Sequence, residues 1–146
     1  MQTGATFDDN GLGKHLQGMS ARIDKRVKAG VQAISRDFVR EVTGREGLSK
    51  YPRHSRGTPT PSPAGDVPAQ VTTMLRKSNQ IQPAVRIGFG VYQQTVQNNA
   101  VYARIQEFGG SNTPARPFMR PAKIRTMAKA DKLFKQAVLL EVKRGK

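Results

Sequence analysis

"KHLQGMSARIDKRVKAGVQAISRDFVREVT", residues 14–43, carries the strongest structural pattern in the sequence. Its apolar residues recur at steps of three or four, which aligns them along one face of a helix. They are Leu16, Met19, Ile23, Val27, Val31, Ile34, Phe38 and Val42. Basic residues such as Arg22 and Arg36 fall on the opposite surface, and Gly44 follows where a helix would end. We therefore predict one long amphipathic helix over residues 14–43.

The segments on both sides of this helix have no such periodicity. Residues 1–13 form a polar stretch with several turn-forming residues, and we interpret them as an N-terminal arm. Residues 44–68 are rich in proline and glycine. Proline fixes φ and removes a backbone donor, so neither a helix nor a central strand can continue through them. We predict a long extended loop there, of the kind that is either functional or disordered in the free protein.

The middle of the chain has the composition of β-structure. We predict one strand within residues 72–81 and a second over residues 84–92, joined by a turn at residues 80–83. The two strands would form a hairpin. Gly88 and Gly90 weaken the interior of the second strand and indicate a bulge or a close approach of another backbone.

Two further helices are predicted in the last third of the chain. A short helix ends at Phe108, with Asn98 or Asn99 as its N-cap. A long basic helix covers residues 121–144, because proline suits a first helical position and apolar residues again recur. The predicted class is α+β, with both long helices packed on a small antiparallel sheet. Residues 14–146 would make a single domain.

Composition restricts the possible partners. The 146 residues include 25 Lys and Arg against 10 Asp and Glu, a formal net charge of +15. Such a charge favours polyanionic or acidic partners, since it opposes an isolated compact state. Hydrophobic residues make up 36% and aromatic residues 6% of the chain, which suits a subunit that buries surface against neighbours. No apolar run approaches the roughly 18 residues of a membrane helix, and the N-terminus does not resemble a secretory signal.

The residues needed for catalysis or metal binding are scarce. The chain has no cysteine, and its two histidines are His15 and His54. No spacing typical of metal ligands, nucleophile elbows or phosphate-binding loops occurs. We therefore expect a protein without enzymatic activity, metal or cofactor.

Nucleic-acid binding is the natural alternative for so basic a chain. Sequence-specific DNA reading would need a docking element such as a helix-turn-helix, and the sequence contains none that we recognise. Single-strand binding usually interleaves aromatic and basic residues, yet the basic C-terminal segment offers Phe118 and Phe134 as its aromatic residues. A small basic architectural protein that binds phosphate without base specificity therefore remains possible.

Two stretches carry a family resemblance. "PSPAGDVPAQVTTMLRKS", residues 61–78, followed by "VYARIQEFGGSNTPARPFMRPA", residues 101–122, resembles the tail-completion, or head–tail joining, proteins of long-tailed bacteriophages. The residues that match the family's two later motifs are Tyr102, Ala103, Glu107, Phe108, Gly109, Pro117, Phe118, Met119, Pro121 and Ala122. Those that match its first motif more loosely are Gly65, Pro68, Thr73, Leu75 and Ser78. Met74 and Gly110 depart from the family pattern, which often has Gly and Thr there.

The resemblance implies a structural virion protein. Members of this family are α+β subunits that act in a ring, usually six-fold, at the head-proximal end of the tail. The implied partners are copies of the same chain, the tail terminator and the head–tail connector, with non-specific contact to DNA in the lumen. The protein would be assembled in the host cytoplasm and reside in the virion neck. A sibling neck protein, either the tail terminator or the head-completion stopper, is an alternative of the same class.

Two sets of contact residues follow from this reading. Phe108 and Phe118 would be apolar anchors, although for Phe108 we favour a place in the subunit's own core. Glu107 would pair with Arg116 or Arg120, in the same subunit or the next, so Glu107→Ala should weaken oligomers and leave the fold intact. The candidates for subunit or partner contact are Glu107, Phe108, Gly109, Arg116, Phe118, Met119 and Arg120. The candidates for contact with DNA phosphate or an acidic partner are Arg45, Lys50, Arg53, Arg56, Lys123, Arg125, Lys129 and Lys132.

Overall fold

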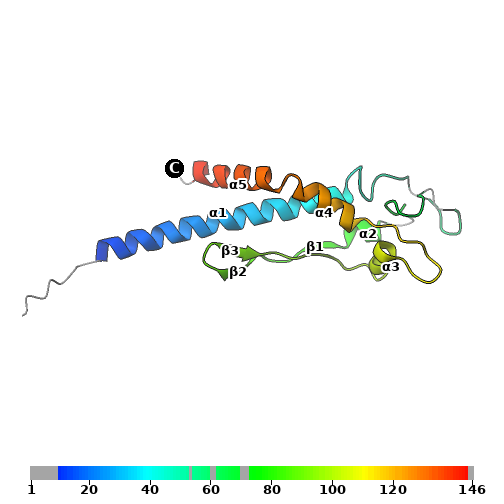
Figure 1. Ribbon diagram of the computed structural model, residues 1–146, viewed down its shortest axis with the longest axis horizontal. Helices are drawn as coiled ribbons and strands as arrows, with labels where there is room; N and C mark the ends of the chain where they lie inside the picture. The colour runs from blue at the N-terminus through cyan, green and yellow to red at the C-terminus, as the bar shows by residue number, and fades with distance from the viewer. Residues whose placement is uncertain (1–9, 53, 60–61, 70–72, 145–146) are drawn as a thin grey trace, which may run out of the picture.

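The long N-terminal helix organises the molecule. The computed structural model describes residues 10–52, 54–59, 62–69 and 73–144. Within them the chain is α+β, as predicted, and extends along its first helix (Figure 1). In chain order the elements are α1 (Asn10–Thr43), α2 (Met74–Lys77), β1 (Asn79–Ile81), β2 (Val85–Gly88), β3 (Val91–Gln93), β4 (Val96–Asn98), α3 (Ala103–Phe108), α4 (Met119–Met127) and α5 (Ala130–Arg144).

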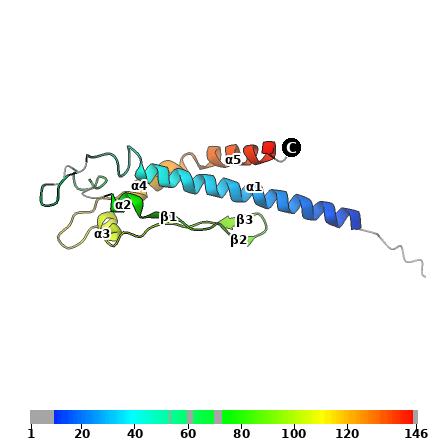
Figure 2. The same cartoon turned by 180° about the vertical axis from the view of Figure 1, so that it is seen from behind.

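Helix α1 confirms the prediction from periodicity, and it begins at Asn10 rather than Lys14. At 1.5 Å per residue its length is about 51 Å. It lies between α4 and α5 on one side and the β-strands on the other, as both views show (Figures 1 and 2). The α5 helix approaches α1 closely at Gly30, where an added Cβ would clash with the ring of Phe134. Glycine is thus required there by the helix–helix contact.

The strands form one long two-stranded ribbon. β1 pairs with β4 and β2 pairs with β3, both antiparallel. Between the two ladders the backbone N–H of Gln82 donates to the carbonyl of Thr95 at 2.9 Å. The predicted hairpin is therefore wrong in its pairing: the turn falls after Gly88, and residues 80–83 lie within the ribbon. The register shifts between Arg86 and Gly88, which marks a β-bulge or a similar irregularity at the first of the two glycines where a bulge or a close backbone approach is predicted.

A tertiary contact holds the turn of this ribbon. Asp24 on α1 accepts the backbone N–H of Gly90 at 3.2 Å and forms an ion pair with Arg86 at 3.1 Å. The turn therefore lies inside the stretch of apolar alternation, residues 84–92. It is held by a residue more than sixty positions earlier in the chain. Residues 74–77, predicted within a strand, instead form α2, which buries Leu75.

The two C-terminal helices replace the single helix predicted over residues 121–144. The break lies between α4 and α5, where Lys129 N–H donates to the carbonyl of Thr126 at 3.0 Å. α4 begins at Met119, so Pro121 occupies its first turn but not its first position. α3 begins after Tyr102, and neither Asn98 nor Asn99 caps it. Asn98 instead binds the carbonyl of Leu75 at 2.6 Å.

The buried core is small and lies at the C-terminal end of α1. Four elements meet there: α2, α3, α4 and the loop that follows α1 (Figure 1). Its buried hydrophobic residues are Val42, Leu48, Val67, Leu75, Ala100, Ala103, Phe118 and Ala122. As predicted, the described residues within 44–68 form neither helix nor strand. They nevertheless contribute Leu48 and Val67 to the core, so this loop is partly structural.

Candidate assembly surface

Glu107 links α3 to the start of α4. One carboxylate oxygen accepts the backbone N–H groups of Phe118 at 2.8 Å and Met119 at 2.9 Å. The other accepts the backbone N–H of Arg120 at 2.9 Å. The first N–H groups of a helix have no partner within the helix, and its N-terminus carries partial positive charge. Glu107 satisfies both needs and acts as a remote N-cap.

This geometry corrects the predicted role of Glu107. Within the subunit the carboxylate binds backbone N–H groups, and not the guanidinium of Arg116 or Arg120. Arg116 instead donates from Nε to the carbonyl of Ser62 at 3.3 Å, which ties the loop before α4 to the loop after α1. Replacing Glu107 would therefore perturb the fold itself. The prediction that Glu107→Ala leaves the fold intact conflicts with these contacts.

Gly109 forms the turn that makes this link possible. Its φ is 82°, in the region where L-residues are strained, and its N–H donates to the Ile105 carbonyl at 2.8 Å. An added Cβ would lie 3.1 Å from the backbone nitrogen of Ala115 and 3.2 Å from the Thr113 carbonyl oxygen. The loop after Gly109 thus packs directly on the turn. Gly109, a candidate partner contact, has a structural role inside the subunit.

The two motif phenylalanines have opposite environments. Phe118 is completely buried, whereas Phe108 is 77% exposed. The prediction that Phe108 belongs to the core is therefore wrong. On α3 the buried residue is Ala103, and Phe108 follows five positions later, which rotates it about 140° away from Ala103. Phe118 cannot touch a partner directly in this structure, while Phe108 can.

Phe108 stands at the edge of an open hollow of about 600 Å³ between α1, α3 and α4, which we name the α3–α4 groove. Its lining residues are Phe38, Asn98, Ala103, Arg104, Glu107, Phe108, Met119, Arg120 and Lys123. Most of its surface is apolar, and exposed Arg104, Arg120 and Lys123 surround it with positive charge. Its one carboxylate, that of Glu107, is occupied by backbone N–H groups. The groove therefore suits an apolar group that carries negative charge beside it.

Large hydrophobic side chains are also exposed on other elements. One set lies on the ribbon around its turn, a second on the N-terminal half of α1, and a third on α4. The members of these sets are Val85, Ile87, Phe89 and Val91; Leu16, Met19 and Ile23; and Ile124 and Met127. Exposed large hydrophobic side chains that gather on one surface often mark an interaction site. None of these residues was selected from the sequence as a contact candidate. The alternation of apolar residues over 85–91 could have indicated the set on the ribbon, because a two-stranded ribbon can leave such a row of side chains uncovered.

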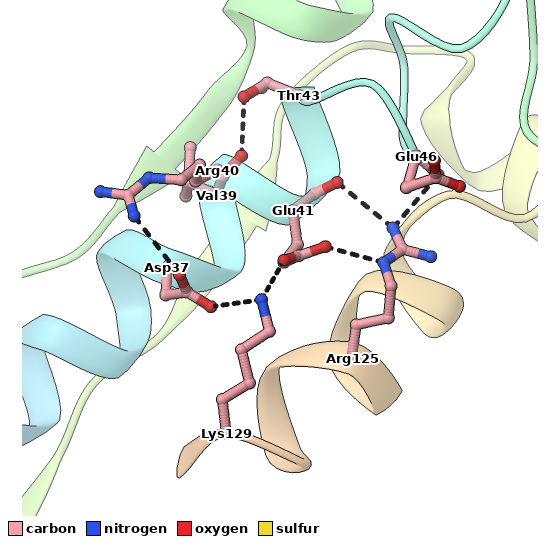
Figure 3. Close-up of polar contacts among 8 residues, drawn as sticks. All are labelled: Asp37, Val39, Arg40, Glu41, Thr43, Glu46, Arg125 and Lys129. Atoms are coloured by element: carbon pink, nitrogen blue, oxygen red, sulfur yellow. Dashed lines mark hydrogen bonds and ion pairs between the residues drawn. The ribbon is translucent and has the colours of Figure 1, made fainter. Parts of the chain in front are cut away.

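Two of the predicted phosphate-binding residues are engaged inside the subunit. Arg125 Nε donates to Glu41 at 2.7 Å, and Lys129 forms ion pairs with Glu41 and Asp37, the latter at 3.7 Å. Figure 3 shows the Lys129 ammonium between the two α1 carboxylates, with Arg125 also reaching the backbone carbonyl of Glu46. Lys129 and then Arg125 hold the pKa of Glu41 below its ordinary value. These contacts fasten α4 to α1.

Lys50 is likewise paired within the subunit. Its ammonium lies 2.6 Å from Asp66, which also accepts the Tyr51 hydroxyl at 2.8 Å. Lys50, then Tyr51 and the backbone N–H of Val67, lower the pKa of Asp66 from 3.8 to about 2. Among the other candidates, Arg45, Arg56, Lys123 and Lys132 are exposed. Arg53 lies outside the described residues.

No family model, curated protein or solved structure matches this chain. Among the described residues, no group of three or more His, Asp or Glu side chains could hold a metal ion. None of the helices in the described ranges combines the length and apolar character needed to cross a bilayer. The surfaces described above are an apolar groove with basic edges and an exposed apolar ribbon.

Proposed function

We propose that the chain is a structural virion protein of the tail-completion type. It assembles into a ring at the head-proximal end of a phage tail and supports the joining of head and tail. It acts through contacts with copies of itself and with neighbouring neck proteins, and it carries out no chemistry. The motif resemblance over residues 101–122 supplies the family, and the exposed apolar surfaces supply the physical argument.

The observation that carries the proposal is the imbalance between core and exposed apolar surface. The largest fully buried side chains are Phe118, Leu48 and Val42, while Phe89 is 65% and Phe108 77% exposed. Burying such side chains contributes about 1.5–3 kcal/mol each, and this free energy is available only when a partner covers them. A subunit designed for assembly has this distribution, because its neighbours complete its apolar contacts.

The distribution of charge supports the same proposal. Most of the described acidic side chains bind basic side chains or backbone N–H groups of the chain itself. They are Asp24, Asp37, Glu41, Asp66, Glu107 and Glu141. The exposed surface therefore keeps most of the formal charge of +15. In a ring around DNA, or beside an acidic neck protein, this charge would be compensated.

The same charge favours a second candidate, a small basic nucleic-acid-binding protein. The two candidates predict different behaviour of the purified subunit. A nucleic-acid-binding protein should bind DNA or RNA with nanomolar Kd at physiological salt. A neck subunit should bind weakly as a monomer, with an affinity that falls steeply as salt rises, because its contacts would be to phosphates alone.

The test is electron microscopy of lysates from virus that lacks this gene, with a complemented control. The proposal predicts filled heads beside separate tails that fail to join, and restored particles on complementation. Tail length distinguishes the siblings: irregularly long tails indicate a terminator, and tails of normal length with leaking heads indicate a head-side stopper. Fully joined, infectious particles without the gene would contradict all three neck roles.

A further inference from the structure

The α3–α4 groove has the chemistry to hold a specific segment of a second copy of the chain. We propose that the groove binds the N-terminal arm of a neighbouring subunit, with Phe7 on its apolar surface and Asp8 and Asp9 facing its basic edges. This inference rests on the proposed function as an assembling subunit. It adds which segment of one copy meets which surface of the next.

Charge complementarity selects the arm as the occupant. Asp8 and Asp9 are the only adjacent acids in the sequence, and an aromatic residue, Phe7, directly precedes them. The groove has the inverse arrangement, an apolar surface edged by the exposed Arg104, Arg120 and Lys123. A nucleic-acid phosphate would match these edges but not the apolar surface between them. The ribbon turn of a second copy is apolar, but residues 85–93 contain no acidic side chain to meet these edges.

Chain length excludes the subunit's own groove. Phe38, which lines the groove, lies 28 positions after Asn10 on α1, so the helix separates them by about 42 Å. Phe7 is three positions before Asn10 and can reach at most about 11 Å from it, even in a fully extended chain. The groove and the helix start therefore lie at opposite ends of the molecule (Figure 1). An arm in the groove must come from another copy.

Such a contact has a defined consequence for assembly. It joins the start of one chain to the far end of the next, which is a head-to-tail contact between different surfaces. Contacts of this type generate a ring when the rotation between subunits closes, and a filament when it does not. The arm thus supplies a link that a symmetric dimer contact would not provide, and it suits a ring.

A labelled peptide of residues 1–13 tests the contact directly. Its fluorescence anisotropy is measured against the full-length chain at concentrations where the chain is monomeric. We expect saturable binding that weakens at least tenfold in the Phe7→Ala peptide, because the buried aromatic contact is lost. The peptide with Asp8→Asn and Asp9→Asn should weaken roughly threefold to tenfold, since exposed ion pairs are individually modest.

Matched variants of the full-length chain locate the binding surface. Lys123→Glu, at the groove, should weaken the peptide at least fivefold. Lys132→Glu, an exposed position on α5 with the same change in charge, should leave binding nearly unchanged. Equal losses in both variants would mean non-specific charge attraction and would overturn the proposal, as would the absence of saturable binding. Competition by a peptide of residues 85–93 instead of the arm peptide would assign the groove to the ribbon.

The virus separates this inference from the proposed function. Complementation of the gene deletion with the Phe7→Ala chain should yield few joined particles, compared with the wild-type chain. If the deletion blocks joining but Phe7→Ala restores it fully, the arm contact is wrong and the proposed function stands. If the deletion has no effect, the proposed function fails, whatever the peptide binds.

Discussion

The two ends of α1 differ in what covers their apolar face. At the C-terminal end, Val42 and Phe118 are completely buried among α3, α4 and the loop that follows α1. At the N-terminal end Met19 is exposed, and along the ribbon beside α1 Ile87 and Phe89 face solvent. The core residues at the C-terminal end are covered within the subunit, whereas the large apolar side chains named at the other end and on the ribbon are not.

The sequence periodicity is the same at both ends, so it does not reveal this difference. A helical apolar stripe shows which face will be covered, but not whether the chain itself or a neighbour covers it. In this protein the covering elements gather at one end, since α2, α3 and α4 all lie there (Figure 2). The buried core is therefore confined to one end of α1, and the other end carries exposed apolar side chains.

The largest effect should come from a core residue at the C-terminal end of α1. Phe118→Ala should reduce the free energy of unfolding by about 3–5 kcal/mol, because it removes a buried ring and leaves a cavity. Phe108→Ala, the matched control, should change it by less than about 0.5 kcal/mol, because that ring is mostly exposed. Urea denaturation followed by circular dichroism measures both. Similar losses in the two variants would contradict the assignment of Phe118 to the core and Phe108 to the surface.

A smaller loss should follow from removing the remote cap of α4. Glu107→Ala leaves the N–H groups of Phe118, Met119 and Arg120 without their charged acceptor, so we expect a loss of about 1.5–3 kcal/mol. Glu107→Gln, which keeps one acceptor oxygen, should lose less. Hydrogen exchange of the α4 amides should increase in both variants. Unchanged stability combined with weaker oligomers would instead support the role predicted from the sequence, in which Glu107 contacts a neighbouring subunit.

Acid sensitivity should sharpen the picture of the loop after α1. The charged form of Asp66 binds Lys50 and Tyr51, so the pKa of Asp66 is lower in the folded than in the unfolded state. Its contribution to stability is complete above its ordinary value of 3.8 and is lost as pH falls toward about 2. Asp66→Asn should therefore flatten the decline in denaturation midpoint between these pH values. An identical decline in variant and wild type would show that this contact is absent in solution.

The smallest effect on the fold should come from the exposed turn of the ribbon. Phe89→Ser should change the free energy of unfolding by less than about 0.5 kcal/mol, since the ring is mostly exposed. The same variant should complement the gene deletion poorly if a partner covers Phe89. Measured together, unfolding and particle counts separate loss of fold from loss of assembly. A strongly destabilised Phe89→Ser chain would mean that the ribbon end also belongs to the core.

Features governed by local pattern could be predicted from the sequence. The periodicity of residues 14–43 predicts α1, and the glycines at 88 and 90 indicate a bulge or a close backbone approach where the strand register shifts. The position of the ribbon turn could not be predicted, because Asp24 on α1 fixes it through Gly90 and Arg86. The local alternation of apolar residues does not indicate that contact.

Predictions for charged side chains were limited by long-range contacts. In the sequence, Arg125 looks like any other basic residue on a solvent-facing helix surface. In the structure it binds Glu41, which is 84 positions earlier in the chain. Glu107 was predicted to meet an arginine side chain, and it binds the backbone at the start of α4 instead. Such pairings depend on how α1, α3 and α4 meet, and no spacing in the sequence specifies that arrangement.

Immunogold labelling of purified phage particles tests the proposed role in the neck most directly. Purified particles that carry a tagged copy of the chain would be labelled with gold against the tag and imaged by electron microscopy. The proposed role predicts label at the junction of head and tail in intact particles. Label on the distal tail or the capsid shell, or virions that contain no tagged chain while the lysate does, would contradict a role in the neck.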